Sequence, residues 1–302
     1  MTMLSVHHVT TYNYARPVAL GDHRMMLRPR DSFDQRLISA SLTIEPEPSR
    51  LHWIHDANDN CVTLASFDGE TMRLRIESAI TLDHTPHGGP DFALEERARS
   101  FPFAYGFEEI PDIARAMERQ YPDPDGELDR WVRKFLQHGR STETGQLLMT
   151  LTTAIRESLS YERREQHGVQ SPLHTLSRGR GSCRDFAVLM MESVRALGLA
   201  ARFVSGYLYV PDRDRGERFH GGGSTHAWCQ VYLPGAGWVE FDPTNGIVGS
   251  RDLIRVAVAR DPRQAVPLSG SFYGNLDDEA GMTVTVNVRR SPGEELARVT
   301  AR

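Results

Sequence analysis

The sequence predicts an α+β protein, in which an N-terminal antiparallel β-sandwich domain precedes an α+β domain that carries the chemistry. Residues 1–85 hold short alternating runs without a helical period, residues 111–160 hold amphipathic helical patterns, and residues 202–289 return to strand-like runs. A helical layer followed by antiparallel strands is typical of the α+β class. With 302 residues, of which 39% are hydrophobic and 25% charged, the chain can bury a large core.

The first domain is expected at residues 1–85. Alternate residues of Leu4–Tyr14 share one face of an extended chain. The further strand-like runs are Arg36–Glu45, Leu51–Asp56, Cys61–Phe67 and Thr71–Leu82, with Pro, Asn, Asp and Gly between them. Several short strands separated by turn residues favour an antiparallel sandwich. We find no cluster of chemically reactive residues in this half.

A segment rich in Pro, Gly, His and acidic residues follows and predicts a linker at residues 86–110. The second domain, residues 111–302, is expected to hold a helical layer, an antiparallel sheet and a C-terminal β extension. Its helical patterns are Pro111–Gln120, Glu127–Gln137, Glu143–Ser160 and a short helix from Cys183, and its strand-like runs are Arg202–Val210, Thr225–Leu233, Gly237–Phe241, Leu253–Ala259 and Met282–Arg289.

Composition and charge argue against several classes of protein. The net charge of −5 is not that of a general nucleic-acid-binding protein. No stretch approaches the roughly 18–20 apolar residues that cross a bilayer, and the N-terminus lacks the basic start and apolar run of a signal peptide. Three scattered cysteines are too few for a disulfide framework. We therefore expect a soluble cytoplasmic protein with free thiols and with no membrane or nucleic-acid partner; the sequence does not indicate an oligomeric state.

The segment Gly179–Ala187 (GRGSCRDFA) holds the strongest candidate for a nucleophile. Ser182 can cap a helix, and Asp185 three residues later completes a capping-box arrangement. Cys183 then occupies the first helical position, where unsatisfied N–H groups and the positive end of the helix dipole favour a thiolate. A buried structural cysteine is the competing interpretation, because free cysteines commonly pack in cores.

A strand and a hairpin downstream supply a base and its partner. Thr225–Leu233 alternates so that His226 lies on one face, whereas Cys229 has the opposite parity and is expected in the core. The returning strand Trp238–Asp242 can carry Asp242 back to the His226 end. A thiol enzyme needs this arrangement, because the histidine takes the thiol proton and a carboxylate fixes its tautomer.

Metal binding is the other role open to these residue types. Neither a CxxC nor an HExxH spacing includes Cys183 or His226, so we expect no metal and no cofactor. The pairs His52/His55 and His84/His87 have no third ligand beside them, and we interpret them as surface or linker residues.

The order of these motifs resembles the core of bacterial transglutaminase-like proteins, which are relatives of papain-like thiol enzymes. GxGSCRDFA, LGLAARFVSGY and HAWxQVYLPGxGWVEFDPTNG, all within residues 179–246, carry the resemblance. HxTxYxY at His8–Tyr14 and LRPR at Leu27–Arg30 are similar to the N-terminal β domain of that family. Val256–Gly274 is similar to its C-terminal extension. The resemblance thus implies a transglutaminase/papain-like catalytic core behind a β domain.

Residue by residue, the resemblance implies Cys183 as the nucleophile, His226 as general base and acid, and Asp242 as the residue that orients His226. The Cys183 backbone N–H is the natural first donor to an oxyanion, and the sequence does not identify the second. Eukaryotic transglutaminases carry a tryptophan well upstream of the cysteine, but Tyr161–Arg180 contains none.

The expected reaction is attack of the Cys183 thiolate on an amide carbonyl of a peptide or protein substrate, which leaves a thioester for water or an amine to resolve. Trp228 and Tyr207 are expected to bind substrate as walls of the cleft, with a core role as the alternative for such aromatic side chains. The charged, glycine-rich segment Pro211–Gly223 is expected to be a solvated connection, with a mobile substrate-contacting loop as the alternative.

We favour hydrolysis over cross-linking, because bacterial members with this architecture resemble cysteine proteases and Lys134, the only lysine, would make this chain a poor amine donor. Transamidation to another amine is the first alternative. A non-catalytic peptide-binding module is the second, and the complete set of Cys183, His226 and Asp242 speaks against it. Acyl transfer from coenzyme A shares the triad logic, but the family that performs it lacks a β domain of this kind.

Overall fold

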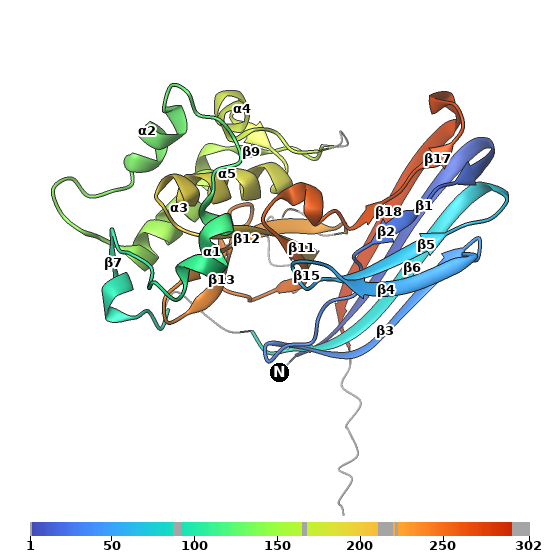
Figure 1. The fold of residues 1–302 in the computed structure, drawn as a ribbon, viewed down its shortest axis with the longest axis horizontal. Coiled ribbons are helices and arrows are strands. Elements are labelled where there is room, and N and C mark those ends of the chain that lie inside the picture. Colours follow the sequence, from blue (N-terminus) through green and yellow to red (C-terminus); the bar gives the residue numbers. More distant parts are fainter. Residues whose placement is uncertain (1, 87–91, 165–167, 211–219, 221–222, 292–302) are drawn as a thin grey trace, which may run out of the picture.

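The computed structural model describes residues 2–86, 92–164, 168–210, 220 and 223–291. Figure 1 shows a strand-rich domain beside a domain in which helices cover a central sheet, which confirms the predicted α+β class. The helices are α1 (Ile110–Met117), α2 (Glu127–Arg133), α3 (Thr144–Ser158), α4 (Pro172–Arg178), α5 (Cys183–Ala196) and the short 3₁₀ turns η1 (Glu96–Ala98), η2 (Pro262–Gln264) and η3 (Leu276–Asp278). Within the described ranges, none of them is long and apolar enough to span a bilayer.

The strands fall into two groups along the chain. Those of the first half are β1 (Thr2–Leu20), β2 (His23–Met25), β3 (Gln35–Glu45), β4 (Arg50–His55), β5 (Cys61–Ser66), β6 (Glu70–His84) and β7 (Ser100–Phe101). Those of the second half are β8 (Thr142–Glu143), β9 (Ser160–Tyr161), β10 (Arg180–Gly181), β11 (Ala201–Leu208), β12 (His226–Leu233), β13 (Gly237–Asp242), β14 (Ile247–Val248), β15 (Leu253–Ala259), β16 (Leu268–Ser269), β17 (Phe272–Tyr273) and β18 (Glu279–Arg290).

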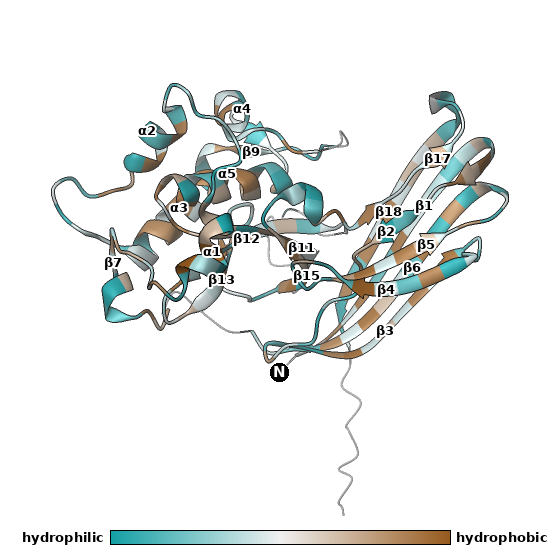
Figure 2. Ribbon diagram, viewed as in Figure 1, coloured by the Kyte–Doolittle hydropathy of each residue, from teal (hydrophilic) through white to brown (hydrophobic). Residues whose placement is uncertain are grey.

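Two sheets form the β domain. One has the order β17-β1-β6-β3, with β18 also paired to β1, and the other has the order β16-β2-β5-β4. Buried and exposed side chains alternate along β6, and Figure 2 shows mixed hydropathy along these strands. Leu74 and Ile76 from the first sheet share an apolar core with Met25 and Ala65 from the second. The alternation in the sequence therefore builds a sandwich, because each sheet buries one face against the other.

The C-terminal strands join these same sheets. β18 runs antiparallel along β1 from Leu4↔Arg290 to Tyr14↔Glu279, while β17 pairs with β1 and β16 with β2. The sequence pattern had placed this segment in the second domain as an extension, but its hydrogen bonds tie it to the first. The pairing covers an edge of β1 that would otherwise expose main-chain groups. The domain boundaries at residues 85 and 111 stay a prediction.

The second domain is built around helix α5 and the sheet β14-β13-β12-β11-β15. Ala187, Met190 and Val194 of α5 share one apolar core with Phe203 and Val231 of the sheet. This stripe has the helical spacing predicted from the sequence. The helix ends at Ala196, and Gly198, two residues later, has a φ of +79°, the left-handed conformation expected for a glycine that stops a helix.

Helix α4 is an element that the sequence pattern did not predict. It spans only Pro172–Arg178, which is too short for a helical period to stand out. Local signals nevertheless define it: the Ser171 side chain accepts the His174 N–H, Pro172 opens the helix, and Gly179 with φ +64° closes it. The strand β10 and the start of α5 follow directly, so α4 sets the approach to Cys183.

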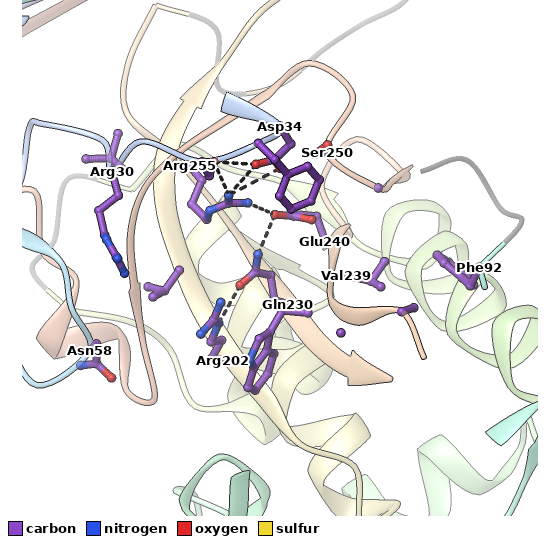
Figure 3. Close-up of a pocket in the computed structure, with 18 of the residues that line it drawn as sticks. Arg30, Asp34, Asn58, Phe92, Arg202, Gln230, Val239, Glu240, Ser250 and Arg255 are labelled. Atoms are coloured by element: carbon purple, nitrogen blue, oxygen red, sulfur yellow. Dashed lines mark hydrogen bonds and ion pairs between the residues drawn. The ribbon is translucent and has the colours of Figure 1, made fainter. Parts of the chain in front are cut away.

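Strand β15 is the edge of the second domain's sheet that meets the β domain. The side-chain amide of Gln35 bonds both main-chain groups of Arg255 at 2.8 Å, and the amide of Asn60 does the same for Val258 at 2.8 Å. Two amide side chains thus replace a neighbouring strand and protect this edge. The Arg255 guanidinium adds ion pairs to Asp34 and Glu240 (Figure 3), so the two domains are held in a fixed register.

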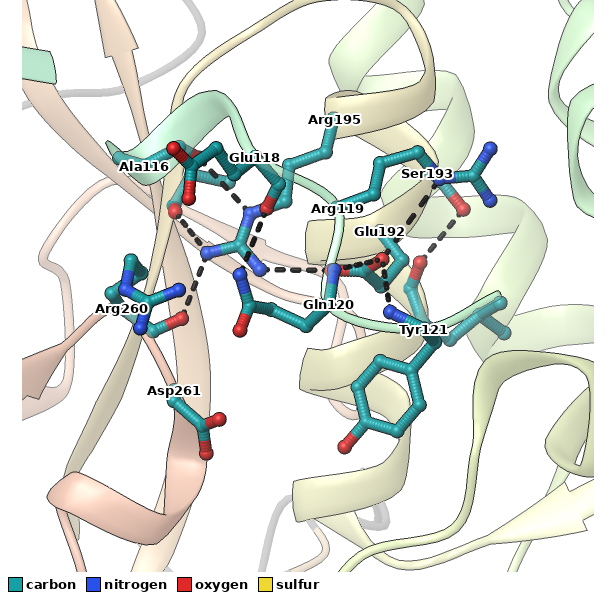
Figure 4. Close-up of polar contacts among 12 residues, drawn as sticks. Ala116, Glu118, Arg119, Gln120, Tyr121, Glu192, Ser193, Arg195, Arg260 and Asp261 are labelled. Atoms are coloured by element: carbon teal, nitrogen blue, oxygen red, sulfur yellow. Dashed lines mark hydrogen bonds and ion pairs between the residues drawn. The ribbon is translucent and has the colours of Figure 1, made fainter. Parts of the chain in front are cut away.

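A buried ion pair fixes the other side of α5. Glu192 and Arg195 lie 2.8 Å apart, and their side chains are 0% and 1% exposed. Arg195 also donates to the main-chain carbonyls of Ala116, Ala201 and Arg260, while Glu192 accepts the N–H groups of Gln120 and Tyr121 (Figure 4). Every charge in the pair is therefore compensated, which a buried pair requires to avoid a large desolvation cost.

Candidate active site

Cys183 is the first residue of α5, as the sequence predicted. Its side chain is buried, with 7% exposure. Ser182 precedes the helix, and its N–H and hydroxyl both donate to the Asp185 carboxylate at 2.8 Å. The first N–H groups of a helix have no acceptor within the helix, so they point a partial positive charge toward the Cys183 end. The position favours an anion, whether the thiolate or an oxyanion formed beside it.

Asp185 organises the chain around this helix start. Besides Ser182, its carboxylate accepts the N–H of Gln170 at 2.7 Å and the side-chain amide of Gln170 at 3.0 Å, and it pairs with Arg164 at 2.7 Å. Burial tends to raise the pKa of Asp185, but these hydrogen bonds hold it below its usual value. The ionised carboxylate therefore ties three segments together immediately behind the nucleophile.

His226 and Asp242 form a fully buried pair at the end of the β12–β13 hairpin. The Nε2 of His226 lies 2.8 Å from Oδ2 of Asp242, and both side chains are 0% exposed. The other carboxylate oxygen accepts the Thr244 N–H at 2.9 Å, in the turn that follows the strand. The hairpin register pairs Cys229 with Phe241, which brings the start of β12 beside the end of β13. The sequence prediction that the hairpin returns Asp242 to His226 is thus confirmed.

The electrostatics of the pair favour opposite charges. Burial alone would lower the pKa of His226, but the charge and hydrogen bond of Asp242 and the interaction with Cys183 raise it to about 10. Burial would raise the pKa of Asp242, whereas His226 and hydrogen bonds from neighbouring groups hold it below its usual value. An imidazole that gives its Nε2–H to Asp242 keeps Nδ1 as its reactive nitrogen.

The Nδ1 atom of His226 is left for the thiol. It is buried and has no hydrogen-bond partner within the described ranges, while Cys183 is one of the groups that raise the pKa of this imidazole. The Cys183 side chain is therefore one of the groups that act on this ring and favour its protonated form. Catalytic hydrogen bonds commonly tighten only when substrate is bound. The structure brings Cys183, His226 and Asp242 together as one constellation.

Three further residues surround this constellation and were not predicted. Asn245 donates to Oδ2 of Asp242 at 2.7 Å and bonds both main-chain groups of His220, at 2.8 and 3.1 Å. The His220 ring stacks on Tyr161 with centroids 4.3 Å apart. Burial and the nearby charge of Cys183 raise the pKa of Tyr161 to about 12, so its phenol stays protonated beside the sulfur. These residues form a continuous wall from Asp242 to the nucleophile.

The position of Tyr161 follows from a short parallel pairing. β9 pairs with β10 so that Tyr161 lies opposite Gly181, two residues before the nucleophile. A two-residue strand leaves no periodic signal in the sequence. The Asp-Pro-Thr-Asn-Gly turn at residues 242–246 did carry a signal for Asn245, because an asparagine in such a turn commonly bonds a neighbouring carboxylate or main-chain group.

The structure corrects the two predicted cleft residues. Trp228 is 0% exposed, and its ring stacks on His226 with centroids 5.9 Å apart, so it supports the imidazole from within the core. Tyr207 is 1% exposed, packs against the β domain and bonds Nδ1 of His8 at 2.9 Å. Parity had placed both residues on strands near the site. Because the β domain covers that face of β11, Tyr207 belongs to the junction between domains and lines no cleft.

The remaining sequence predictions for the site have mixed outcomes. Cys229 lies in the core with 0% exposure, as expected. Residues 211–219 and 221–222 of the predicted loop lie outside the described residues. In the part of the chain that the structure describes, no three or more His, Cys, Asp or Glu side chains gather in a way that could hold a metal ion.

Known proteins share both halves of this chain. Residues 4–83 match the bacterial transglutaminase-like N-terminal region, and residues 130–243, which include all three constellation residues, match the transglutaminase-like superfamily. An uncharacterised protein of Mycobacterium bovis is 29% identical over 308 positions, covering 96% of this chain and 94% of its own length. One of Mycobacterium leprae is 39% identical over 116 positions, covering 38% of this chain and 40% of its own.

One solved structure shares the whole architecture. A candidate cysteine protease from Cytophaga hutchinsonii superposes with a TM-score of 0.69 at 20% identity, over 96% of this chain and 90% of that one. This likeness shows a common fold.

Proposed function

Because the chain belongs to the transglutaminase-like superfamily, we propose that it is a thiol-dependent hydrolase of amide bonds in peptides or proteins, acting through a thioester on Cys183. One observation carries the proposal. His226 is held by the buried carboxylate of Asp242 through Nε2, its Nδ1 has no partner within the described ranges, and Cys183 is among the groups that raise the pKa of the imidazole. A nucleophile, a base and an orienting carboxylate in this relation are the parts of a triad.

The proposed reaction has two steps, formation of a thioester and its hydrolysis, and Cys183 and His226 take part in both. Nδ1 of His226 takes the thiol proton, and the thiolate attacks the carbonyl carbon, whose oxygen becomes an oxyanion near the Cys183 N–H at the helix start. The imidazolium then protonates the departing amine as the C–N bond breaks, which leaves a thioester. A water molecule gives its proton to His226 and attacks the thioester, and the thiol is regenerated as the carboxylic acid leaves.

Resolution of the thioester by an amine is the second candidate outcome. Both outcomes share the first half-reaction, so the same residues serve either one. The likeness in fold to a candidate cysteine protease supports water as the acceptor. The sequence contains one lysine, Lys134, which limits self-modification but says nothing of a second protein as donor.

The first test measures the reactivity of each cysteine. We would follow iodoacetamide alkylation of Cys61, Cys183 and Cys229 by peptide mass spectrometry from about pH 4 to about pH 9, in wild type and His226→Ala. Cys183 is expected to react faster than the half-exposed Cys61 below neutral pH, although Cys183 is more buried, and to lose this advantage in the variant. Equal rates for Cys61 and Cys183 in wild type would contradict an activated nucleophile.

A second measurement separates hydrolysis from transfer. A library of peptides with fluorescent amide leaving groups, incubated with wild type, Cys183→Ala and the control Cys61→Ser, identifies cleavage that depends on Cys183. Adding a primary amine then shows whether the acyl group is captured as a new amide. Release of free acid at an unchanged rate supports the hydrolase, whereas predominant capture by the amine favours the acyltransferase.

A further inference from the structure

A cavity of about 660 Å³ lies between the β domain and the face of the catalytic sheet that the helices do not cover. Its walls come from residues 30–34, Asn58 and Asn60 of the β domain, from Phe92 and Ala93, and from strands β11, β12, β13 and β15 with their turns. The volume is in the range of small-molecule sites, which occur preferentially between domains. The nucleophile and its base do not line this cavity, so the proposed hydrolysis leaves it unused.

Arg202 is a cation of this cavity without an ion-pair partner in the described ranges; the Asp31 carboxylate, which also lines the cavity, accepts the Leu37 N–H. Its Nε donates to the side-chain oxygen of Gln230 at 2.6 Å, and its guanidinium lies over the Trp238 ring at 4.2 Å from the centroid. No carboxylate lies within ion-pair distance of it in the described ranges, and its two terminal nitrogens make no hydrogen bond there. The partly buried guanidinium of Arg202 is thereby fixed in orientation, and its two terminal nitrogens can donate hydrogen bonds to a ligand.

The neighbouring Arg255 shows what a structural arginine looks like at the same interface. It pairs with Asp34 at 3.1 Å and with Glu240 at 2.5 Å, so its charge is fully compensated. The carboxylates of Asp34 and Glu240 therefore form their ion pairs with Arg255. Burial lowers the pKa of Arg202 to about 10; the charges of Arg255 and Arg30 add to this effect, and the carboxylate of Glu240 opposes it. The Glu240 carboxylate is bonded to Arg255 and Gln230, and it makes no ion pair with Arg202 within the described ranges.

The β domain contributes polar groups to the same space. Figure 3 shows Arg30 and Asn58 on the β-domain side of the cavity and Arg202 and Gln230 on the sheet side. Arg30 is paired with Asp59 at its outer edge, where both side chains are about half exposed. Arg30 ends the LRPR motif at Leu27–Arg30, to which the catalytic constellation gives no role.

We propose that this cavity is a binding site for a small organic anion, a carboxylate or a phosphate ester, with the Arg202 guanidinium as its principal partner. The planar fork of an arginine suits two oxygens of such a group, and the Trp238 ring holds the fork in place. Arg30 and Asn58 supply further donors from the opposite wall. The site does not depend on the proposed hydrolase activity, and either can hold without the other.

The test uses benzoate and phenyl phosphate as probes, with sodium chloride at equal ionic strength as the control. Binding to the full-length protein is measured by calorimetry and by the shift in melting temperature. Wild type is expected to bind at least one probe, and comparison of the two probes distinguishes a carboxylate site from a phosphate site. Arg202→Met keeps a side chain over Trp238 but removes the charge, and is expected to weaken binding about tenfold or more.

Arg16→Met is the matched control, because Arg16 is 77% exposed on β1 and does not line the cavity. It is expected to bind as wild type does. No binding of either probe beyond the chloride control overturns the proposal, as does equal affinity in Arg202→Met. Should that variant not fold, crystals of wild type soaked in 4-bromobenzoate decide the matter: a bromine signal in the cavity supports the site, and its absence there overturns it.

Discussion

Strands β12 and β13 carry two polar clusters that are built in opposite ways. At one end, His226 and Asp242 are fully buried, and one ring nitrogen remains without a partner. Further along the same strands, Gln230 and Glu240 bond each other and belong to a network that opens on a cavity, where the cation Arg202 has no ion-pair partner within the described ranges. The first cluster leaves a base beside a thiol, and the second leaves a cation in a recess. In each cluster, the group without a partner indicates the chemistry that the cluster can perform: His226 Nδ1 can accept a proton, and the Arg202 guanidinium can bind an anion.

Changing the carboxylate in each cluster should give the largest contrast. Asp242→Asn leaves His226 without the charge that fixes its tautomer, and we expect kcat to fall about 10³–10⁴-fold, as when the aspartate of a triad is changed to asparagine. Glu240→Gln, two residues earlier on the same strand, should change kcat less than about threefold. The measurement is turnover of a peptide substrate found in the library screen.

Both variants need a check that they fold, by circular dichroism and melting temperature. If folded Asp242→Asn and Glu240→Gln lost similar amounts of activity, the His226–Asp242 cluster would be no more important for catalysis than the Glu240 cluster. That result would remove the main support for Asp242 as the residue that orients His226.

Arg195 and Arg202, two arginines of the second domain, are expected to differ in how much they contribute to stability. Arg195→Met leaves Glu192 charged and buried without its partner (Figure 4), which should cost about 3–5 kcal/mol of unfolding free energy. Arg202→Met removes one hydrogen bond and a contact between a cation and a ring, with an expected cost of about 1 kcal/mol or less. Urea unfolding of both variants measures the difference. A larger cost at Arg202 would mean that this cation stabilises the fold in the absence of ligand.

Asn245 should show a smaller effect, as a positioning residue for Asp242. Asn245→Ala removes a charge-assisted hydrogen bond of 2.7 Å, and we expect kcat/KM to fall about 10–100-fold. Because that bond is among the contacts that lower the pKa of Asp242, the acid limb of the pH–rate profile should move to higher pH. Asn13→Ala, at an exposed position on β1, is the control. A lower rate with an unmoved acid limb would point to a purely structural role.

Local signals predicted where Cys183, His226 and Asp242 lie. The Ser182–Asp185 pair and the stripe from Ala187 to Val194 define where α5 begins and which face it buries. The alternation in β12 and the turn before β13 define the hairpin that joins His226 to Asp242. Each of these depends on contacts close in sequence, which periodicity and capping rules describe.

What the sequence did not predict depends on contacts between distant segments. Parity places Tyr207 on a face of β11, but it cannot tell that the β domain covers that face. The pairing of β18 with β1 joins residues almost 300 positions apart, and no local pattern records such a partner. Tyr161 reaches the nucleophile through a two-residue strand whose effect depends on β10. In each case the role of the residue depends on which distant segment packs against it.

The pH dependence of stability is the last effect we predict, and it is expected to come from the His226–Asp242 cluster. Because the folded state raises the pKa of His226 from 6.5 to about 10, the folded protein holds a proton that the unfolded chain releases between these values. The stabilisation is complete below about pH 6.5 and is lost as the pH rises through 10, by at most about 1.4 kcal/mol per pH unit. Asp242, whose pKa is lowered, acts in the opposite range, since its stabilisation is present above 3.8 and is lost at lower pH.

The double variant His226→Gln/Asp242→Asn removes both titrating groups without leaving one charge buried alone. Urea unfolding from about pH 6 to about pH 10 should therefore show a shallower decline for this variant than for wild type. Glu240→Gln should keep the wild-type slope, because Glu240 bonds Gln230 and Arg255 in the other cluster. Parallel curves for wild type and the double variant would mean that the imidazolium–carboxylate pair is not the form that folding stabilises. His226 would then be neutral at rest, and the thiol proton would move only when substrate arrives.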